Sequence, residues 1–312
     1  MFKEYLKFDA TGIAELVARR EVSAPEVLDA ALARLDAVNP KINAFCTPMI
    51  DAARARAAGP LSGPFAGVPF LIKDLAMPVA GWPRTSGSRY TRGFVDTQDG
   101  GLTARYRASG AVLLGKTNTP EYGITGTTES RALGPCRNPW NPAHISGGSS
   151  GGSASAVAAG IVPLAHASDG LGSIRIPAAC CGLVGLKVTR DRVPNLPDGY
   201  DYAFGNVVDH VVSRTVRDSA VMLDATGQPE PNAPYPAPPK DRPYAEEVLR
   251  SPGKLRIAFS SETPNGRPID PEIEAALQRT AALLKGLGHE VIERGLGIDY
   301  RALYASRGAA AA

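Results

Sequence analysis

The stretch Ser146-Gly-Gly-Ser-Ser-Gly-Gly-Ser153 contains only serine and glycine, and a helix-competent run, Ala154–Ala159, follows it at once. Low complexity of this kind is typical of a flexible linker. A second segment, Ala167-Ser-Asp-Gly-Leu-Gly-Ser-Ile-Arg-Ile-Pro177, then places a serine behind several small residues. Small residues let backbone amides approach a reacting group closely. Together the two segments indicate a reactive serine site built into a fold.

Outward from this centre, short apolar runs alternate with helical patterns. Four runs predict buried strands, at 68–72, 111–114, 161–165 and 183–186, and two segments predict helices, at 102–109 and 215–225. Strands that alternate with helices favour a sheet that is covered by helices on both faces. We therefore expect an α/β fold.

The first 60 residues predict a helical N-terminal segment. Ser23-Ala-Pro-Glu26 is a capping box, and apolar residues recur after it at helical spacing. Asn39-Pro40 is expected to end that helix, because proline disfavours helical geometry in the residue before it.

The C-terminal part of the chain begins with a proline-rich segment. Seven of the fifteen residues from 229 to 243 are proline, which predicts an extended surface loop. A strand at 255–259, a helix at 270–287 and a strand from 291 are expected to follow. The chain then stops at Gly308 and four alanines, an ending that resembles a helix cut short.

Composition narrows the class of protein. The 312 residues are 44% hydrophobic and 21% charged, and 34 basic residues against 31 acidic ones give a net charge of +3. This composition is ordinary for a globular protein. The net charge is too small for a protein that binds nucleic acid electrostatically. No run of 18 apolar residues predicts a membrane span. We expect a cytoplasmic protein with buried thiols at its four cysteines, namely Cys46, Cys136, Cys180 and Cys181.

Two motifs match known patterns only formally. The segment Gly110–Thr117 fits the P-loop spacing, but its four central residues are apolar and themselves predict a strand. The segment Gly147–Gly151 fits G-x-S-x-G, but a nucleophile elbow needs a strand directly before it, and Asn138–Pro142 there is rich in turn residues. The four histidines show no ligand spacing, so no metal site is expected.

Lys73 closes the apolar run at 68–72 and is followed by Asp74. Burial at the end of a strand would lower the pKa of its amine, and a neutral lysine can act as a base. The alternative is that Lys73 is solvated at the strand end.

Five blocks in order resemble the amidase signature family, and together they cover most of the chain. They are Gly67–Asp74, Gly115–Glu121, Asn138–Pro142, Gly147–Ser153 and Asp169–Pro177. The N-terminal region is similar to the 6-aminohexanoate-cyclic-dimer hydrolase branch of the family. The resemblance implies a mixed β-sheet core flanked by helices on both faces, in a single domain over 1–312 whose C-terminal portion is missing.

The resemblance also implies the chemistry and the residues that perform it. Ser173 would be the nucleophile, Ser149 the bridging serine after a cis peptide, and Lys73 the terminal base of an amide hydrolase that needs no cofactor. The backbone amides of Gly170, Leu171 and Gly172 would form the oxyanion hole. The supporting residues would be Ser150, Asp169 and Arg175.

Leu171 departs from the family, which usually has glycine at this position. It either narrows the pocket or alters the oxyanion hole. The expected partner is a small linear or cyclic amide, with neither nucleic acid nor a membrane, and the sequence leaves room for a homo-oligomer. Two alternatives stay open: the amidase subunit of a tRNA-dependent amidotransferase, and an inactive amidase-like binding protein.

Overall fold

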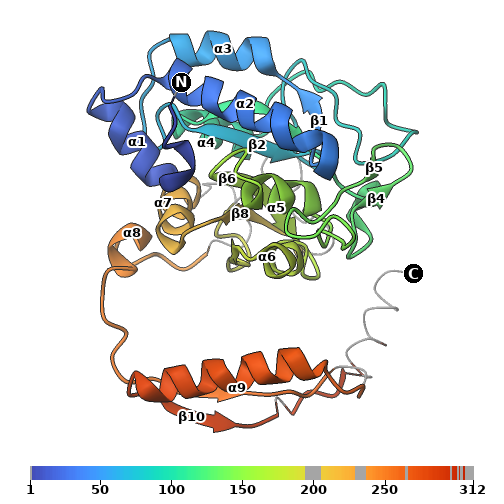
Figure 1. Ribbon diagram of the computed structural model, residues 1–312, viewed down its shortest axis with the longest axis vertical. Helices are drawn as coiled ribbons and strands as arrows, with labels where there is room; N and C mark the ends of the chain where they lie inside the picture. Colours follow the sequence, from blue (N-terminus) through green and yellow to red (C-terminus); the bar gives the residue numbers. More distant parts are fainter. Residues whose placement is uncertain are drawn as a thin grey trace. The chain divides into compact units, whose positions relative to one another are not determined.

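The computed structural model describes residues 2–193, 205–228, 237–263, 266–295 and 297–300, together with Ala302 and Ala305. The chain divides into two compact units, residues 1–249 and residues 250–312 (Figure 1). The sequence predicted a single domain over 1–312, and the structure separates the residues from Arg250 onward as a unit of their own. Both serine segments lie in the larger unit.

A six-stranded mixed sheet forms the centre of the larger unit. Its strand order is β1-β3-β2-β6-β8-β7. The parallel strands β2, β3 and β6 lie together, and the other strands pair antiparallel. The strands are β1 (Phe45–Pro48), β2 (Pro69–Lys73), β3 (Val112–Thr117), β6 (Leu164–Asp169), β7 (Val184–Gly185) and β8 (Val208–Ser213). The predicted mixed sheet is confirmed.

Helices cover both faces of this sheet. Ser153 of α5 contacts the Thr117 hydroxyl on one face, whereas Tyr106 of α4 stacks against Phe70 on the other. The helical elements of the larger unit are η1 (Tyr5–Lys7), α1 (Ala10–Ala18), α2 (Ala24–Ile42), α3 (Ile50–Ala58), α4 (Gly101–Ala108), η2 (Glu121–Gly123), α5 (Gly151–Ala158), α6 (Arg175–Cys181), α7 (Val216–Thr226) and α8 (Tyr244–Glu247). A two-stranded hairpin of β4 (Glu129–Ser130) and β5 (Gly134–Pro135) completes the unit.

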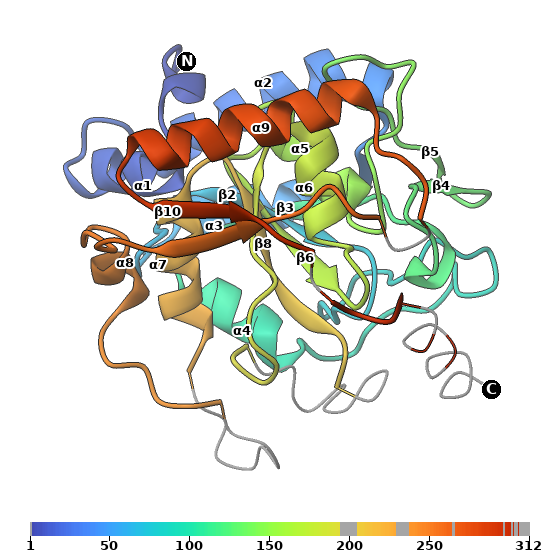
Figure 2. The same cartoon turned by 90° about the horizontal axis from the view of Figure 1, so that it is seen from below.

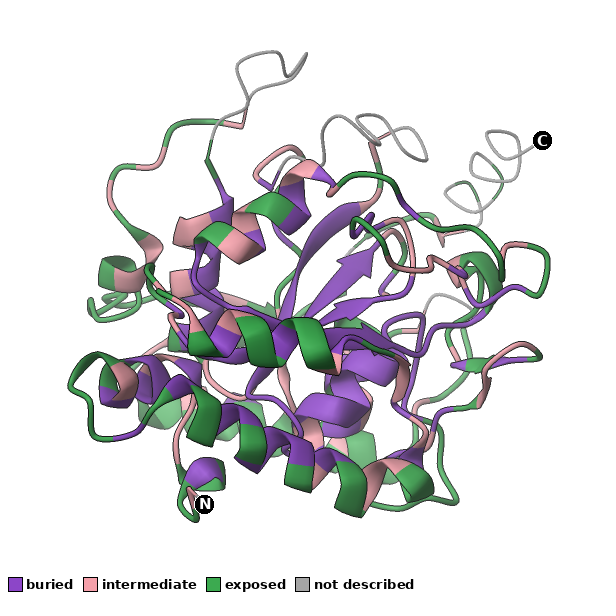
Figure 3. Cartoon of the chain, turned by 90° about the horizontal axis from the view of Figure 1, so that it is seen from above, coloured by how far each residue is buried: buried purple, intermediate pink, exposed green. Residues whose placement is uncertain are grey.

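The four inner strands β2, β3, β6 and β8 are buried along their whole length (Figure 3). Strands that are buried on both faces have near-continuous apolar sequences. Charged or polar side chains on these strands therefore lie inside the protein, and each needs a partner there. This is the setting in which Lys73 lies.

The N-terminal segment is helical as predicted, with two corrections. The capping box is confirmed, because Ser23 and Glu26 exchange hydrogen bonds at the start of α2. The helix does not end at Asn39-Pro40 but continues through Pro40 to Ile42, and Asn43 then caps it with a left-handed backbone at φ 50°. Residues Phe45–Pro48 form strand β1, because Gly115 of β3 has no side chain and leaves room for the Phe45 ring.

The smaller unit is a β-α-β element. Strands β9 (Arg256–Phe259) and β10 (Glu290–Glu293) pair in parallel, and α9 (Pro271–Gly286) lies along them (Figure 2). Asp270 caps α9 by accepting from the Glu272 amide. All three elements are confirmed. Of the proline-rich loop, residues 237–243 contain no helix or strand, and residues 229–236 lie outside the described residues.

No helix in the described part of the chain has the length and apolarity needed to cross a bilayer.

Candidate active site

Lys73 is the last residue of β2, and its side chain is completely buried. Its amine nitrogen Nζ lies 2.7 Å from Ser149 Oγ and 2.9 Å from Ser168 Oγ. The solvated alternative is therefore wrong. Both of these hydrogen-bond partners are hydroxyl groups, which can donate to a neutral amine as well as accept from a charged one.

Burial lowers the pKa of Lys73 from its ordinary value to about 7, although the carboxylates of Asp209 and Asp169 oppose the shift. Removal from water penalises the ammonium form, so a large fraction of this lysine is neutral near pH 7. A neutral amine has a free lone pair and can accept a proton. The site thus contains a base in contact with a serine hydroxyl.

Ser149 is nearly completely buried and follows a cis peptide bond with Gly148. Its carbonyl accepts a hydrogen bond from the Thr119 hydroxyl, which lies just beyond β3. A Cβ at Gly148 would lie 2.6 Å from the Thr127 carbonyl oxygen, so this position has no room for a side chain. The glycine before Ser149 therefore permits the close approach that fixes the serine over Lys73.

Ser150 links three segments of the site. Its hydroxyl donates to the Ser168 carbonyl and accepts from the Ser168 amide, both at 3.3 Å. Its own amide donates to the Ser173 carbonyl at 3.3 Å. The residue thus connects the start of α5, the end of β6 and the loop that carries Ser173. The supporting role of Ser150 stays a prediction.

Asp169 organises the loop between β6 and α6. Its carboxylate accepts from the backbone amides of Gly172, Ile174 and Arg175 and from the Arg175 guanidinium at 2.9 and 3.0 Å. Burial alone would raise the pKa of Asp169, but the Arg175 side chain and the Gly172 amide outweigh it and hold the pKa below its ordinary value. Asp169 is therefore an anion that orders this loop.

The same contacts bear on the predicted oxyanion hole. The Gly172 amide donates to Asp169 Oδ1 at 2.7 Å and is thus engaged inside the loop. Gly172 has a φ of 120°, a backbone that favours glycine, whereas Leu171 has no positive φ. The Leu171 side chain is 63% exposed. The oxyanion role of Gly170, Leu171 and Gly172 stays a prediction.

Ser173 is half-buried beside this loop. Its carbonyl is tied to the Ser150 amide, which brings its backbone next to the residue that follows Ser149. Among the described residues, no hydrogen bond joins the Ser173 hydroxyl to another side chain. The first step of the predicted relay, from Ser149 to Lys73, is thus a direct contact, and the step from Ser173 to Ser149 stays a prediction.

Sequence reasoning missed three residues of this site. Ser168 contacts the Lys73 amine, and His166 and Asp209 form a buried pair beside the Lys73 backbone. Ser168 and His166 occupy alternate positions of β6, a period-two signal that the apolar run at 161–165 did not reveal. Asp209 lies on β8, a strand that the sequence did not predict.

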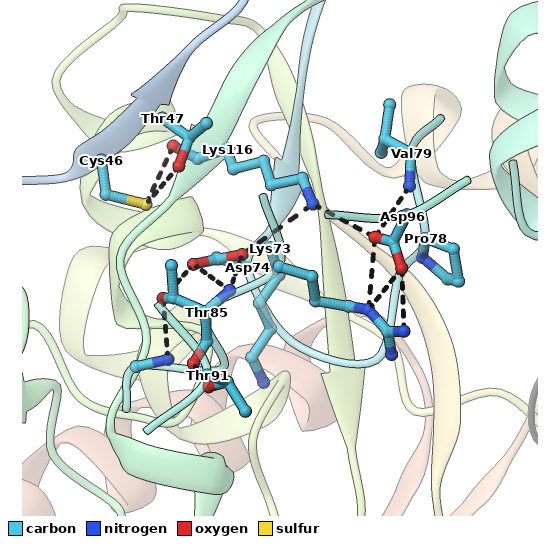
Figure 4. A network of polar contacts seen from close by, with 12 residues as sticks. Cys46, Thr47, Lys73, Asp74, Pro78, Val79, Thr85, Thr91, Asp96 and Lys116 are labelled. Atoms are coloured by element: carbon cyan, nitrogen blue, oxygen red, sulfur yellow. Dashed lines mark hydrogen bonds and ion pairs between the residues drawn. The ribbon is translucent and has the colours of Figure 1, made fainter. Parts of the chain in front are cut away.

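A second buried lysine, Lys116, lies on the neighbouring strand β3 (Figure 4). Its nitrogen lies 3.9 Å from Asp74 Oδ1 and 3.9 Å from Asp96 Oδ2. Asp74 also accepts from the Thr85 amide and hydroxyl, and Asp96 pairs with Arg84. Lys116 belongs to the segment that matched the P-loop spacing. Because Val112–Thr117 is a strand, the rejection of a phosphate loop there is confirmed.

No cluster of three or more histidine, cysteine, aspartate or glutamate side chains in the described ranges is arranged to hold a metal ion.

Comparison with known proteins agrees with this geometry. The family model described as Amidase matches residues 26–298. This chain belongs to the amidase family. It is 46% identical over 297 residues to 6-aminohexanoate-cyclic-dimer hydrolase of Paenarthrobacter ureafaciens, a match that covers 93% of this chain and 60% of the relative. The chain thus spans about three fifths of the length of that relative.

Solved structures of relatives have the same fold. One of 6-aminohexanoate cyclic dimer hydrolase complexed with substrate superposes with a TM-score of 0.88 at 44% identity, covering 93% of this chain and 61% of that one. A glutamyl-tRNA(Gln) amidotransferase component from Thermotoga maritima superposes with a TM-score of 0.81 at 26% identity, covering 95% of this chain and 63% of that one. The predicted α/β fold and the predicted family are both confirmed.

Proposed function

We propose that this protein hydrolyses the amide bond of a small linear or cyclic substrate through a serine–serine–lysine relay. The observation that carries the proposal is the 2.7 Å contact between the buried Lys73 amine and the Ser149 hydroxyl. A base with a pKa of about 7 is suited to remove a proton at neutral pH. Family membership supports amide hydrolysis as the reaction.

In the proposed mechanism, neutral Lys73 accepts the proton of Ser149 while Ser149 accepts the proton of Ser173. The Ser173 oxygen then forms a bond to the amide carbonyl carbon, because a serine hydroxyl becomes a strong nucleophile when a positioned base takes its proton. Backbone amides of Gly170, Leu171 and Ser173 hold the resulting oxyanion, because the Gly172 amide already donates to Asp169. As the carbon–nitrogen bond breaks, Ser149 returns a proton to the departing amine.

An acyl-enzyme on Ser173 remains, and water hydrolyses it. The water gives its proton to the same relay, attacks the ester carbonyl and releases the carboxylic acid. No step needs a metal or an organic cofactor. Burial raises the pKa values of the thiols of Cys136, Cys180 and Cys181, so they are poor competing nucleophiles. Free thiols also support the cytoplasm as the compartment.

The relatives support a substrate class. The relative from Paenarthrobacter ureafaciens is named for hydrolysis of a cyclic dimer of 6-aminohexanoate, and the 46% identity over 93% of this chain supports a similar small, unbranched amide. The amidotransferase alternative has less support, because the amidotransferase component is only 26% identical. Copurification of partner subunits with glutaminase activity would favour it instead.

The test is labelling of the 312-residue chain with a fluorophosphonate probe, followed by a screen of small linear and cyclic amides. We expect the probe to label Ser173 and Ser173→Ala to remove both labelling and turnover. Labelling that persists in Ser173→Ala would refute the assignment of the nucleophile. A folded wild-type chain that no serine probe labels would indicate the alternative, an inactive binding protein.

A further inference from the structure

The polypeptide around Lys73 contains a buried pair that the proposed relay does not use. His166 Nδ1 lies 3.2 Å from the Lys73 backbone nitrogen, and His166 Nε2 lies 3.0 Å from Asp209 Oδ1. His166 is completely buried and Asp209 is 4% exposed. A backbone N–H is always a donor, so Nδ1 must be the acceptor, and the ring proton must lie on Nε2, which donates to the carboxylate.

The His166 imidazole accepts the hydrogen bond from the Lys73 backbone N–H, where a carbonyl of a neighbouring strand would ordinarily be the acceptor. β2 and β6 pair at Leu71 and Ala165, and two residues further along β2 the Lys73 N–H meets the His166 ring. His166 has two further contacts: its ring packs against Tyr106 of α4, and its backbone carbonyl accepts a hydrogen bond from the Ser153 hydroxyl of α5. The backbone of Lys73 is therefore fixed by a side chain that Asp209 orients.

We propose that His166 and Asp209 are positioning residues for Lys73: the imidazole fixes the backbone of the base, and the Asp209 carboxylate supplies negative charge that keeps its amine able to hold a proton after accepting one. This inference rests on the proposed function. A base that is too weakly basic would not hold the relayed proton, and one that is too basic would be permanently charged.

The charge of the Asp209 carboxylate acts on the Lys73 amine. Burial lowers the pKa of Lys73 to about 7, and Asp209 is the foremost group that opposes this shift, followed by Asp169. Burial also lowers the pKa of His166, so the ring stays neutral and keeps its acceptor. Helices α2 and α5 present no buried titratable side chain. Asp209 and Asp169 are the charged groups that act on the Lys73 amine, and the His166 ring contacts the Lys73 backbone. The other buried titratable side chains next to Lys73 in the chain, on β3, on α4 and on β8 are Asp74, Lys116, Tyr106 and His210, and Lys116 leaves the sheet on the opposite face.

Asp209→Asn is the decisive variant, because an asparagine oxygen still accepts from His166 Nε2 while the charge is gone. We expect the rate of fluorophosphonate labelling to rise with pH in both proteins. In Asp209→Asn the midpoint of that rise should move to lower pH by about one pH unit, because loss of a nearby negative charge disfavours the ammonium form. An unchanged midpoint would overturn the role of Asp209.

Asp218→Asn is the matched control. Asp218 is also a completely buried aspartate, and it accepts from the Ala10 and Thr11 amides at the start of α1. This variant should lower the stability of the protein and leave the midpoint of the labelling profile in place. If Asp218→Asn moves the midpoint as far as Asp209→Asn does, the shift reports general loosening and the proposal fails.

The histidine is tested by a pair of variants. His166→Leu removes the acceptor for the Lys73 amide and should reduce the plateau labelling rate at high pH by about tenfold, within the range for a misplaced general base. His166→Asn places an oxygen near the Nδ1 position and should recover part of that rate. Equal plateau rates in His166→Leu and the wild type would overturn the positioning role.

Failure of this inference can be told apart from failure of the proposed function. If the wild-type labelling rate has no midpoint near pH 7, or if Lys73→Met is labelled as fast as the wild type, the relay itself is wrong. If the wild type titrates and Lys73→Met does not react, but Asp209→Asn and His166→Leu match the wild type, only the positioning pair is wrong.

Discussion

Two lysines on adjacent strands, Lys73 at the end of β2 and Lys116 on β3, are both completely buried but have opposite surroundings. In the parallel pairing, Lys73 is the partner of Thr117, whereas Lys116 is the partner of Ile72. Because side chains alternate along a strand, the two lysines leave the sheet on opposite faces. The Lys73 amine contacts two hydroxyls. Figure 4 shows the Lys116 amine between the carboxylates of Asp74 and Asp96.

The difference teaches what decides the role of a buried lysine. Burial lowers the pKa of both amines, so burial alone does not mark a catalytic base. Lys116 has the carboxylates of Asp74 and Asp96 at 3.9 Å, and these oppose the lowering of its pKa by burial. Lys73 faces hydroxyls that can pass a proton to it. The chemistry of the immediate partners therefore supports the base role that we propose for Lys73 and a structural role for Lys116.

The largest expected effect is the loss of reactivity when Lys73, and not Lys116, is replaced. Lys73→Met should reduce turnover and probe labelling of Ser173 by about 10³-fold, because a general base contributes 10²–10⁴ in rate. Lys116→Met should retain labelling within about tenfold in whatever fraction of the protein remains folded. The measurement is the labelling rate per folded molecule, with far-ultraviolet circular dichroism as the control for folding. A similar loss of rate in both variants would mean that the two lysines do not have separate roles.

The second effect is on stability, and here replacement of Lys116 should cost more than replacement of Lys73. Lys116→Met should lower the free energy of unfolding by about 3 kcal/mol, because it leaves the buried Asp74 carboxylate without a cation in the described part of the chain, whereas Asp96 keeps Arg84. Lys73→Met should leave it within about 1 kcal/mol of the wild type or increase it, as substitutions at strained active sites often do. Urea unfolding at pH 7 measures both.

A double variant sharpens this stability test. In Lys116→Met with Asp74→Asn, the carboxylate that lost its only cation among the described residues is gone, so part of the lost stability should return. A double variant that is less stable than Lys116→Met alone would show that the ion pairs of Lys116 are not the source of the loss.

The third effect is the pH dependence of the reaction. In the proposed mechanism Lys73 acts in its neutral form. Burial lowers its pKa to about 7, so the reactive fraction should fall tenfold for each pH unit below 7 and reach a plateau above about pH 8. The labelling rate between pH 5 and 9 measures this profile. Lys116 should not contribute to the rise, since its amine has two carboxylates beside it and, within the described ranges, no hydrogen bond to a serine hydroxyl. A flat profile would contradict a neutral lysine base.

The smallest effect concerns Ser150, the neighbour of the bridging serine. Ser150→Ala removes the hydroxyl that donates to the Ser168 carbonyl and accepts from the Ser168 amide, and the loss of such buried partners costs about 1–3 kcal/mol. We expect a lower melting temperature and a labelling profile with an unchanged midpoint. A midpoint that moves would place Ser150 in the proton relay instead of beside it.

Much of the fold could be predicted from the sequence because the inner strands are short apolar runs. β2, β3, β9 and α9 were predicted within about one to three residues. The run at 161–165 was placed too early, because Ile161–Pro163 is buried without being a strand and β6 begins at Leu164. Strand β8 was missed because its sequence, Val-Asp-His-Val-Val-Ser, contains polar residues that pair inside the protein.

The site residues also divide into those that a local sequence motif marks and those that it does not. Lys73, Ser149 and Ser150 were predicted from motifs that resemble those of the family. The structure places Lys73 in contact with Ser149, and Ser150 in contact with Ser168, the other partner of Lys73. His166 and Asp209 could not be predicted, because their contact joins residues 43 positions apart on two strands whose pairing the sequence does not reveal. The same holds for Ser168, which reaches Lys73 across 95 residues.

These large separations in sequence also affect when the site forms during folding. The contacts of Lys73 with Ser149 and Ser168 span 76 and 95 residues, and each depends on parallel strands whose pairing closes long loops. Long-range pairing of this kind is slow compared with the formation of local helices. In the proposed mechanism, Ser173 reacts only when Lys73 and Ser149 are in contact. Probe labelling of Ser173 during refolding should therefore begin only after the central strands have paired.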